Sequence, residues 1–537
     1  MPSALLRRRG GATVVATRMP NLRLVAAFTV ALALYARTIG FDFTYLDDDV
    51  LILENQAFLA QPSSVAGSFA RPYFARPSGD HAYYRPMVNA SYGLDANLGG
   101  KSPWGYHATN VLLHGLAVGL LFLLLRRLGY GDNLALLGSL LFAVHPALTE
   151  AVAWIPGRND SLLAALAFSA WLLFSRWLEP GHRWGRLGHL LCFLGALFCK
   201  ETAIVLPLLW FGQAVLLEKK PWRAVRPAVV GWAACLAAYG AARFAVLSDH
   251  ASVHGAGMRA ALFNLASLPL GLGKLILPLD LSVLAVPEDI PAWPAMVAAG
   301  LVLGLFFRRR VRREALGFAL ACFALPLLPG LPASTLMVLE NRLYLPAFGV
   351  VLLVCELARA TEWHGRKAWA VGGAVIVLLA ALAFRYSGDF HDRLAFSQAA
   401  VRRSPHSSLA HRNLGVAYHV KGNESAAWRE YEAALAQDSG EPVANNNLAV
   451  ILMGQGRLPE AERRLSQELA VNPGYVPAER NLALVLRGMK RFDEAALHWQ
   501  RVLDLGSRDR EAARELWSYY QTRDPARAER YRAMAGP

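Results

Sequence analysis

Three consecutive aspartates, Asp47, Asp48 and Asp49, stand a few residues after the first long apolar segment of the chain. Adjacent carboxylates beside a membrane are unfavourable unless water, a cation or a proton-donating substrate meets them. They could therefore serve as a general base or hold a divalent cation at the membrane surface. The alternative is structural: one aspartate caps the next helix and the others are solvated.

Four further polar clusters interrupt the apolar sequence. Arginines, carboxylates and a histidine between apolar helices suit an enzyme that handles a charged lipid at the interface. The alternative is structural: loops outside the membrane are generally polar, and Arg158 and Asp160 form an ion pair with each other. The clusters are Tyr84-Arg85-Pro86, His145-Pro146 through Glu150 to Arg158-Asn159-Asp160, Lys200-Glu201, and Glu340-Asn341-Arg342-Leu343-Tyr344.

The composition indicates an integral membrane protein with a further domain. Of the 537 residues, 55% are hydrophobic, and the mean hydropathy of +0.28 exceeds what a soluble domain needs. The net charge of +15 comes from short basic clusters between apolar segments, which argues against nucleic acid as a partner. The five cysteines lie in apolar segments without CxxC spacing, so neither a disulfide framework nor a metal knuckle is expected.

Apolar segments predict eleven membrane spans, although some are shorter than the roughly 20 residues that a span usually needs. The first could be a signal peptide or a retained helix, and the later topology favours a retained helix. The spans lie near 22–38, 106–125, 133–152, 160–178, 187–199, 202–217, 227–247, 291–307, 314–330, 343–358 and 368–385.

Basic residues between the spans predict the topology. The positive-inside rule places the N-terminus inside and the C-terminus outside, provided that 260–279 does not cross. That stretch, broken by Pro269 and Pro278, is expected to be interfacial or re-entrant. The clusters that then face the cytoplasm are Arg126/Arg127, Arg176/Arg183/Arg186, Lys219/Lys220/Arg223/Arg226, Arg308 to Arg313 and Arg359/Arg366/Lys367.

A 34-residue period begins after the last span. Asn413-Leu414, Asn447-Leu448 and Asn481-Leu482 recur at this spacing, as do three alanines, Ala427, Ala461 and Ala495. This is the tetratricopeptide period, and each unit should be a helical hairpin. Repeats are expected at 404–437, 438–471 and 472–505, with 509–534 as a cap or degenerate fourth unit. The predicted domains are thus a membrane domain at 1–389, with its first outer loop at 41–105, and an extracytoplasmic repeat domain at 390–537.

Several ordered motifs carry a resemblance to the transmembrane and tetratricopeptide-repeat-containing protein O-mannosyltransferases and their prokaryotic relatives. The resemblance implies an all-α, GT-C-type glycosyltransferase bundle followed by an α-solenoid, a polyprenyl-phosphate-sugar donor and catalysis on the outer or lumenal side. The motifs are YLDDDVLILEN at 45–55, YYRPMVNASYGLDANLGGKSPWGYHATNVLLH at 83–114, LFAVHPALTEAVAWIPGRNDSLLAAL at 141–166, CKETAIVLP at 199–207 and ENRLYLPAFG at 340–349.

The resemblance also suggests roles for the polar residues. Counting back from Asn55 places the family's acidic pair at Asp47 and Asp48, which are the candidate general bases, while Asp49 is structural. Cations should hold the lipid phosphate as it leaves. The candidates are Arg85, Arg158, Lys200 and Arg342, with His145 as a further donor unless it only ends a helix. The supporting residues are Glu150, Asp160, Glu201, Glu340 and Tyr344.

Three classes of function remain open at this stage. The first is transfer of a sugar, expected to be mannose, to protein hydroxyl groups, with the repeats binding the acceptor or a partner. The second is a GT-C enzyme that glycosylates a lipid or cell-envelope glycan, and the third is a non-enzymatic membrane-anchored scaffold. The expected location is a bacterial inner membrane with the repeats in the periplasm, or the endoplasmic reticulum of a eukaryote.

Overall fold

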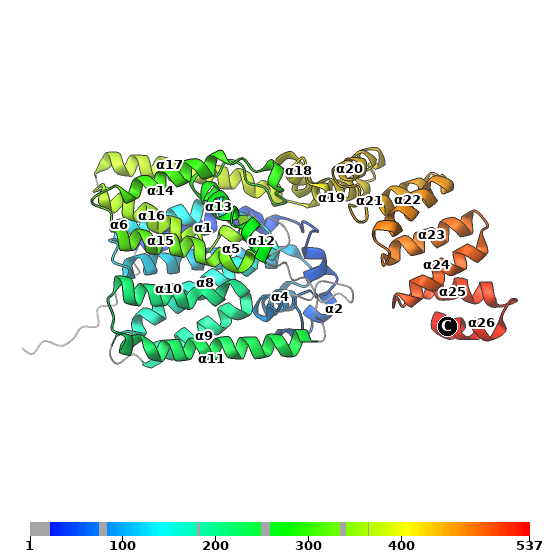
Figure 1. Cartoon of the computed structure of the whole chain (residues 1–537), viewed down its shortest axis with the longest axis horizontal. Coiled ribbons are helices and arrows are strands. Elements are labelled where there is room, and N and C mark those ends of the chain that lie inside the picture. The colour runs from blue at the N-terminus through cyan, green and yellow to red at the C-terminus, as the bar shows by residue number, and fades with distance from the viewer. Residues whose placement is uncertain are drawn as a thin grey trace, which may run out of the picture.

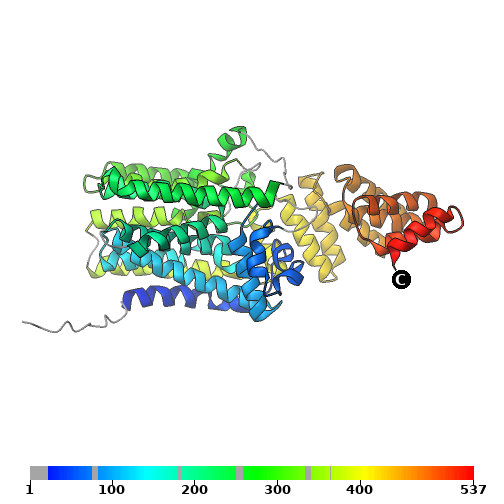
Figure 2. The ribbon, with the colours of Figure 1, turned by 90° about the horizontal axis from the view of Figure 1, so that it is seen from below.

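The computed structural model describes residues 22–74, 83–179, 183–248, 258–332, 340–362 and 365–536. Every regular element in these ranges is a helix, which confirms the all-α prediction. Figure 1 shows a bundle of long, roughly parallel helices, with an arm of shorter helices leaving one end. Figure 2 shows that the arm continues along the length of the bundle rather than folding back over it.

Each of the eleven predicted spans coincides with a helix or with a run of helices. They are α1 (Leu22–Tyr35) with η1 (Ala36–Gly40), α5 (Pro103–Arg127), α6 (Asp132–Val144), α8 (Arg158–Trp177), α9 (Arg183–Cys199), η6 (Glu201–Val205) with α10 (Leu206–Gly212) and η7 (Gln213–Leu217), α11 (Trp222–Leu247), α14 (Trp293–Phe306), α15 (Arg313–Ala324) with η10 (Leu325–Gly330), η11 (Glu340–Leu343) with α16 (Ala347–Ala360), and α17 (Arg366–Ser387).

By length and hydropathy, five of the described helices can cross a membrane, and a sixth can if one bent pair counts as a single span. Three further apolar helices are shorter. The number of spans therefore stays a prediction. The stretch 260–279 forms two short helices, α12 (Met258–Asn264) and α13 (Ser267–Ile276), and its interfacial or re-entrant position also stays a prediction.

The bent pair of helices is interrupted at a proline. α6 ends at Val144, Pro146 starts the turn η4 (Pro146–Leu148), and the axes of the two segments differ by 59°. Proline has no backbone N–H and cannot continue a helix regularly. The chain then passes through α7 (Glu150–Ala153) and η5 (Ile155–Gly157), where a Cβ on Gly157 would lie 2.5 Å from the carbonyl oxygen of Glu150. Glycine lets this tight turn deliver the chain into α8.

The first outer loop folds over the end of the bundle from which the arm leaves (Figure 1). Its elements are η2 (Asp49–Leu53), α2 (Gln56–Leu59), α3 (Ser64–Gly67), η3 (Ser68–Ala70) and α4 (Pro86–Gly99). Pro86 opens α4, a position where the missing N–H costs no helical hydrogen bond. The loop is packed rather than loose: Leu51, Ile52 and Leu59 are buried and belong to the same apolar core as the bundle helices.

The repeat arm consists of four helical hairpins. They are α19 (Ser408–Val420) with α20 (Glu424–Gln437), α21 (Ala444–Gly454) with α22 (Leu458–Val471), α23 (Val476–Gly488) with α24 (Phe492–Asp504), and α25 (Arg510–Tyr520) with α26 (Pro525–Ala535). The helices follow the 34-residue period, and Ala427, Ala461 and Ala495 are buried. The segment predicted as a cap or degenerate fourth unit is thus a complete fourth hairpin.

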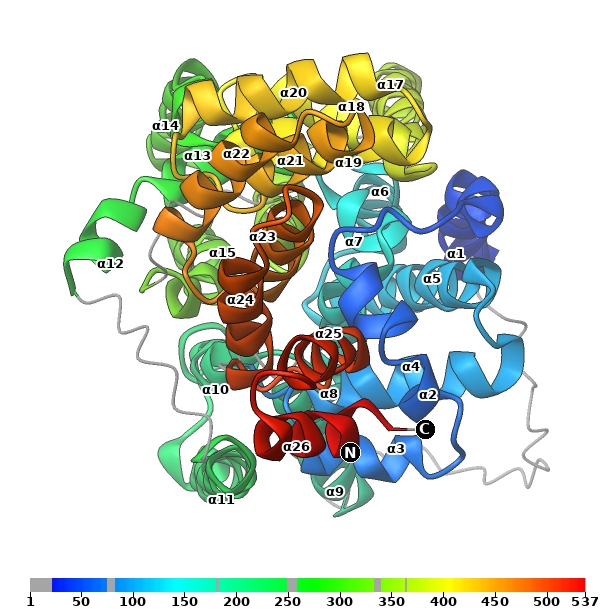
Figure 3. The same cartoon turned by 90° about the vertical axis from the view of Figure 1, so that its right-hand side faces the viewer.

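Only a short joint separates the bundle from the arm. α17 ends at Ser387, η12 spans Gly388–Phe390, and α18 (Arg393–Arg403) begins at once. The backbone N–H of Asp42, in the first outer loop, donates to the carbonyl of His391 at 2.9 Å. Figure 3, seen along the arm, shows α18, α19 and α20 lying across this end of the bundle near α17 and α13.

Candidate functional site

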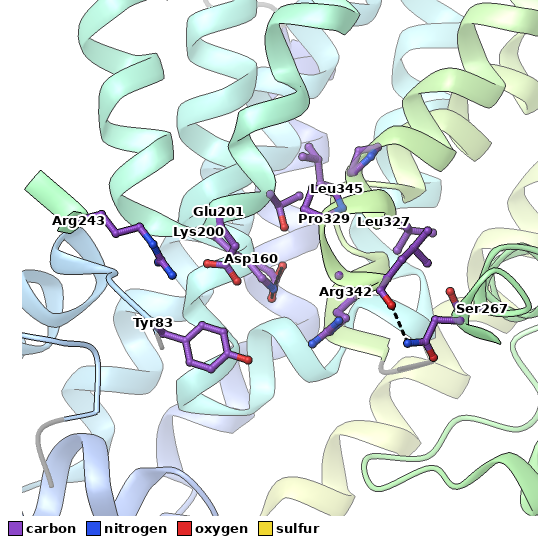
Figure 4. Close-up of a pocket in the computed structure, with 15 residues that line it drawn as sticks. Tyr83, Asp160, Lys200, Glu201, Arg243, Ser267, Leu327, Pro329, Arg342 and Leu345 are labelled. Carbon is purple, nitrogen blue, oxygen red and sulfur yellow. Dashed lines mark hydrogen bonds and ion pairs between the residues drawn. The ribbon is translucent and has the colours of Figure 1, made fainter. Parts of the chain in front are cut away.

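A charged cavity of about 240 Å³ opens at the end of the bundle that carries the first outer loop. It lies between the first turn of α8, the chain after α9, and the turns η10 and η11. Figure 4 shows Asp160, Lys200 and Glu201 on one side and Arg342 on the facing side, with Tyr83 and Arg243 at the edge. Four residues predicted for the donor site or its support, from three separate sequence clusters, thus share one cavity.

Lys200 and Asp160 form the charged wall of this cavity. The Lys200 ammonium lies 2.7 Å from each carboxylate oxygen of Asp160 and 3.3 Å from the amide oxygen of Asn159. Both side chains are buried. Burying two charges is tolerable because they are paired and hydrogen-bonded. The pair joins the end of α9 to the first turn of α8 and holds the ammonium at the cavity.

Arg85 is held beside the cavity by Glu201. Its guanidinium makes a two-pronged contact, with Nη2 to Oε1 at 2.6 Å and Nε to Oε2 at 3.2 Å. The same group lies over the rings of Tyr73 and Tyr83, at 5.1 and 4.6 Å from their centroids. Planar guanidinium groups suit both contacts at once. Glu201 thus fixes the orientation of the Arg85 guanidinium, and the part that this pair plays in donor binding stays a prediction.

Arg342 differs from the other cations of the cavity. It is half-buried and makes no hydrogen bond or ion pair with any residue that the structure describes. A Cβ on Gly330 would lie 2.5 Å from Arg342 Nη1, so the guanidinium packs against a residue without a side chain. The neighbouring carboxylate of Glu340 binds Lys274 instead. Arg342 therefore presents unused donors to the cavity.

Asp48 is buried and organises the first outer loop. Its Oδ2 accepts hydrogen bonds from the Thr44 backbone N–H at 2.8 Å, the Thr44 hydroxyl at 2.5 Å and the Tyr45 N–H at 3.1 Å. Tyr45 adopts a φ of 59°, a strained conformation for a residue with a side chain. The other oxygen, Oδ1, is buried without a hydrogen-bond partner among the described residues. Burial raises the pKa of Asp48 to about 7, despite the three hydrogen bonds, and the Asp47 carboxylate adds to the rise.

Asp47 is half-buried, and its carboxylate acts electrostatically on Tyr73. Burial raises the pKa of Tyr73 to about 12, the Arg85 guanidinium acts against this rise, and the Asp47 carboxylate adds to it. Tyr73 therefore lies close to both the aspartates and Arg85. Through Arg85 and Glu201 this connects the acidic loop with the cavity. Asp49 accepts a hydrogen bond from the next N–H, that of Val50, at 2.8 Å, in a local contact.

Arg158 does not line the cavity. Its side chain has no exposed surface, and its guanidinium sits 4.7 Å from the centroid of the Tyr92 ring. The predicted alternative, a pair with Asp160, is also wrong, because Asp160 binds Lys200. The contacts of the Arg158 guanidinium are Asp95 Oδ2 at 2.5 Å, Asn110 Oδ1 at 2.7 Å, the Tyr106 carbonyl at 2.7 Å and Ser91 Oγ at 3.2 Å.

His145 ends a helix in the structure, as one of the two sequence interpretations had it. Nδ1 accepts from the Ala147 N–H at 3.2 Å, and Nε2 donates to the Leu275 carbonyl at 2.8 Å. Both ring nitrogens are thus occupied within the protein. The residue lies outside the charged cavity.

The remaining supporting residues tie the bundle together. Glu150 accepts from the Asn341 N–H at 3.0 Å, and Glu340 accepts from the Ser282 N–H at 2.9 Å in addition to binding Lys274. The Tyr344 hydroxyl donates to Nδ1 of His114 at 2.7 Å, because Nε2 of that ring donates to a carbonyl. These contacts fix the turn η11 that carries Arg342.

Within the described ranges, no group of three or more His, Cys, Asp or Glu side chains is placed to hold a metal ion.

Sequence reasoning missed Tyr73, Tyr83 and Arg243, which lie at or beside the cavity. Arg243 had a signal, since a cation near the end of an apolar span usually has a functional or structural partner. The two tyrosines had none beyond their position in the first outer loop.

Comparison with known proteins supports a mannosyltransferase-like membrane domain. A family described as "Dolichyl-phosphate-mannose-protein mannosyltransferase" matches residues 80–241. "Protein O-mannosyl-transferase Tmtc1" of Drosophila melanogaster is 36% identical over 190 residues, which cover 35% of this chain and 22% of the fly protein. "Protein O-mannosyl-transferase F38B6.6" of Caenorhabditis elegans is 24% identical over 456 residues, 77% of this chain and 62% of the worm protein.

A mouse relative gives a similarly long match. "Protein O-mannosyl-transferase TMTC4" of Mus musculus is 27% identical over 494 residues, 76% of this chain and 65% of the mouse protein. The chain thus spans from about a fifth to just under two thirds of the relatives named here. Fold and site define an integral membrane protein with a charged cavity at one end and a helical-repeat arm. These matches agree with the resemblance to the transmembrane and tetratricopeptide-repeat-containing protein O-mannosyltransferases that the motifs of the chain indicate.

Proposed function

We propose that the chain transfers mannose from a polyprenyl-phosphate-linked donor to hydroxyl groups of protein acceptors on the outer side of the membrane. The observation that carries the proposal is the cavity in which Arg342 has unused donors beside the paired Lys200, at the same end of the bundle as the acidic first loop. The printed names of the relatives support the sugar and the acceptor.

The cavity would hold the donor phosphate. In the proposed reaction the bond between the anomeric carbon and the phosphate oxygen breaks, and negative charge develops on that oxygen. Lys200 and Arg342 face the space in which this charge would sit, and charge-assisted hydrogen bonds to phosphate are the strong ones. Arg85, which Glu201 holds by two contacts, adds positive potential beside them. Arg158 is left out, because its donors are used inside the protein.

Asp47 would be the general base. The acceptor hydroxyl must lose its proton as its oxygen attacks the anomeric carbon, and the base must be reachable. Asp47 is half-exposed, whereas Asp48 has no exposed surface and binds the loop backbone. Asp48 then acts as the positioning residue that fixes the conformation from which Asp47 projects. The proposal thus makes one aspartate the base and the other the positioning residue, a choice that the sequence alone leaves open.

The arm would present the acceptor. Helical repeats form extended surfaces suited to polypeptides, and the arm leaves the bundle at the end that carries the first outer loop and the cavity (Figure 1). The basic clusters lie in the turns α5–α6, α8–α9, α10–α11, α14–α15 and α16–α17. None of these turns contributes a residue to the acidic loop or to the cavity. The positive-inside rule would put those turns in the cytoplasm and the arm outside it.

The test is a comparison of the three aspartates in the purified full-length protein. We expect Asp47→Asn to lower mannosyl transfer to a peptide by about 10²–10⁴-fold, the usual contribution of a general base. Asp48→Asn should cause a smaller loss, and Asp49→Asn, at the aspartate outside the predicted acidic pair, should remain close to wild type. The assay supplies mannosyl-phosphoryl-polyprenol and measures the mannopeptide by mass spectrometry.

Two outcomes would contradict the proposal. Near-normal transfer by both Asp47→Asn and Asp48→Asn would remove the base assignment. Transfer to a lipid or glycan acceptor but to none of a panel of peptides would instead support an envelope glycosyltransferase, in which the arm serves assembly only.

A further inference from the structure

A second cavity, of about 440 Å³, lies at the junction between the bundle and the repeat arm. Its walls come from the end of α17, the end of α18 and the loop 277–290 that follows α13. It shares no lining residue with the donor cavity. Four cations line it, Lys274, Arg385, Arg402 and Arg403, against two carboxylates, Asp280 and Asp289.

Two polar groups of this cavity are not used within the described protein. Arg385 is exposed and makes no hydrogen bond or ion pair with a described residue. The hydroxyl of Tyr386 is buried, with only 3% of the residue exposed, and has no hydrogen-bond partner among the residues that the structure describes. A buried hydroxyl without a partner is unfavourable, so it favours a ligand that accepts its proton. Both groups donate hydrogen bonds, which points to an anion.

The other charged side chains of the cavity differ in how fully the protein pairs them. Arg403 donates to the Leu281 carbonyl at 2.7 Å and binds Asp389 at 2.9 Å. Arg402 contacts Asp389 only at 3.3 Å and keeps 63% of its side chain exposed. Asp289 is paired with His406 at 2.6 Å. Arg385 and Arg402 are therefore the most exposed cations of the cavity.

One wall of the cavity continues into an apolar, exposed helix surface. Leu382 lines the cavity, and α17 exposes Val375, Val377, Leu378 and Phe384 along its length. Such a surface faces acyl chains in a membrane protein, while phosphate suits the arginines at the helix end. We propose that this cavity binds the phosphate headgroup of an anionic membrane phospholipid whose acyl chains lie along α17.

The position of the cavity gives the bound lipid a structural effect. Ser282 and Ser404 bridge its far side, with 2.6 Å between their hydroxyl oxygens, so the loop after α13 already touches the arm there. A phosphate held by Arg385 from the bundle and Arg402 from α18 would add a second bridge. Because a ligand that binds only the folded state stabilises it, the lipid should raise the temperature at which the junction unfolds.

The experiment measures lipid binding and melting of the full-length protein in detergent, so it does not depend on transferase activity. The variant Arg385→Ala/Arg402→Ala removes the available cations, and Tyr386→Phe removes only the unpartnered hydroxyl. Arg429→Ala, at an exposed arginine on the arm, is the control for loss of an arginine outside the cavity. The probes are phosphatidylglycerol, phosphatidylcholine and inorganic phosphate.

We expect wild type and Arg429→Ala to bind phosphatidylglycerol at least tenfold more tightly than Arg385→Ala/Arg402→Ala, and to melt at a higher temperature when it is added. Tyr386→Phe should show an intermediate loss of affinity. Equal phosphatidylglycerol affinity in the double variant and the control would overturn the site. Equal binding of phosphatidylcholine, or saturation by inorganic phosphate that leaves no effect of added lipid, would overturn the assignment to an anionic lipid.

Discussion

Arg158 and Arg342 are both arginines of polar clusters near the ends of apolar helices, yet their surroundings are opposite. Arg158 has no exposed surface, and protein groups contact all three of its guanidinium nitrogens. Arg342 is half-buried, faces a cavity of about 240 Å³ and contacts no described residue by hydrogen bond or ion pair. The first arrangement joins helices α4, α5 and α8, and the second leaves donors for a ligand.

The comparison shows how a buried charge reveals its role. A charge in the interior must be neutralised and hydrogen-bonded, so a complete set of protein partners indicates a structural residue. An incomplete set at a cavity indicates that the partner is a ligand. Asp48 combines both properties, because three hydrogen bonds hold one oxygen and the other is buried without a partner.

The largest expected effect is on the structural side of the comparison. Arg158→Met leaves the Asp95 carboxylate buried without its cation, and breaking a buried pair in this way costs about 3–5 kcal/mol of stability. We expect a strongly lowered melting temperature and low yield, with partial recovery in Arg158→Met/Asp95→Asn. A variant that melts normally but no longer binds donor would move Arg158 into the donor site.

Arg342→Ala should show the reverse behaviour. Hydrogen bonds to a charged group contribute about 1.5–3 kcal/mol, so donor affinity should fall roughly 10–100-fold. The melting temperature should change little, since no described hydrogen bond or ion pair is lost. Arg342→Lys should not restore affinity, because lysine offers a point charge where arginine offers a planar fork. Early melting with normal donor binding would make Arg342 a structural residue like Arg158.

The smallest expected effect, counted per pH unit, concerns Asp48, which lies between the two cases. Its folded pKa, about 7, is raised above the usual value by burial, so folding favours the protonated form. The stability that this carboxyl contributes is therefore fully present below about pH 4 and is lost as the pH rises through 7. The slope is at most about 1.4 kcal/mol per pH unit in that window.

Melting curves of wild type and Asp48→Asn between pH 4 and 8 check this expectation. Asparagine does not titrate, so the variant should lose this part of the pH dependence and match or exceed wild type at pH 8. If both proteins respond to pH in the same way, the carboxyl of Asp48 is not the group that titrates, and its burial has no energetic consequence of this kind.

Sequence reasoning was strongest where the signal is periodic or long. The eleven apolar segments all fall on helices, and the 34-residue period located the repeat hairpins. It was weakest for partners of individual charges. Arg158 was paired with Asp160 because they are close in sequence, but residues two apart on a helix face different directions. Asp160 finds Lys200, 40 residues away, and Arg158 finds Asp95, so only the folded arrangement could show either pair.

The short joint between α17 and α18 has a consequence for how the arm could select its targets. With the joint held by Asp42 and His391, the arm has little freedom to swing relative to the acidic loop. In the proposed function, a polypeptide lying along the hairpins would then be held in a fixed register with respect to Asp47. The number of hairpins would then set how far from the mannosylated residue the arm contacts the acceptor.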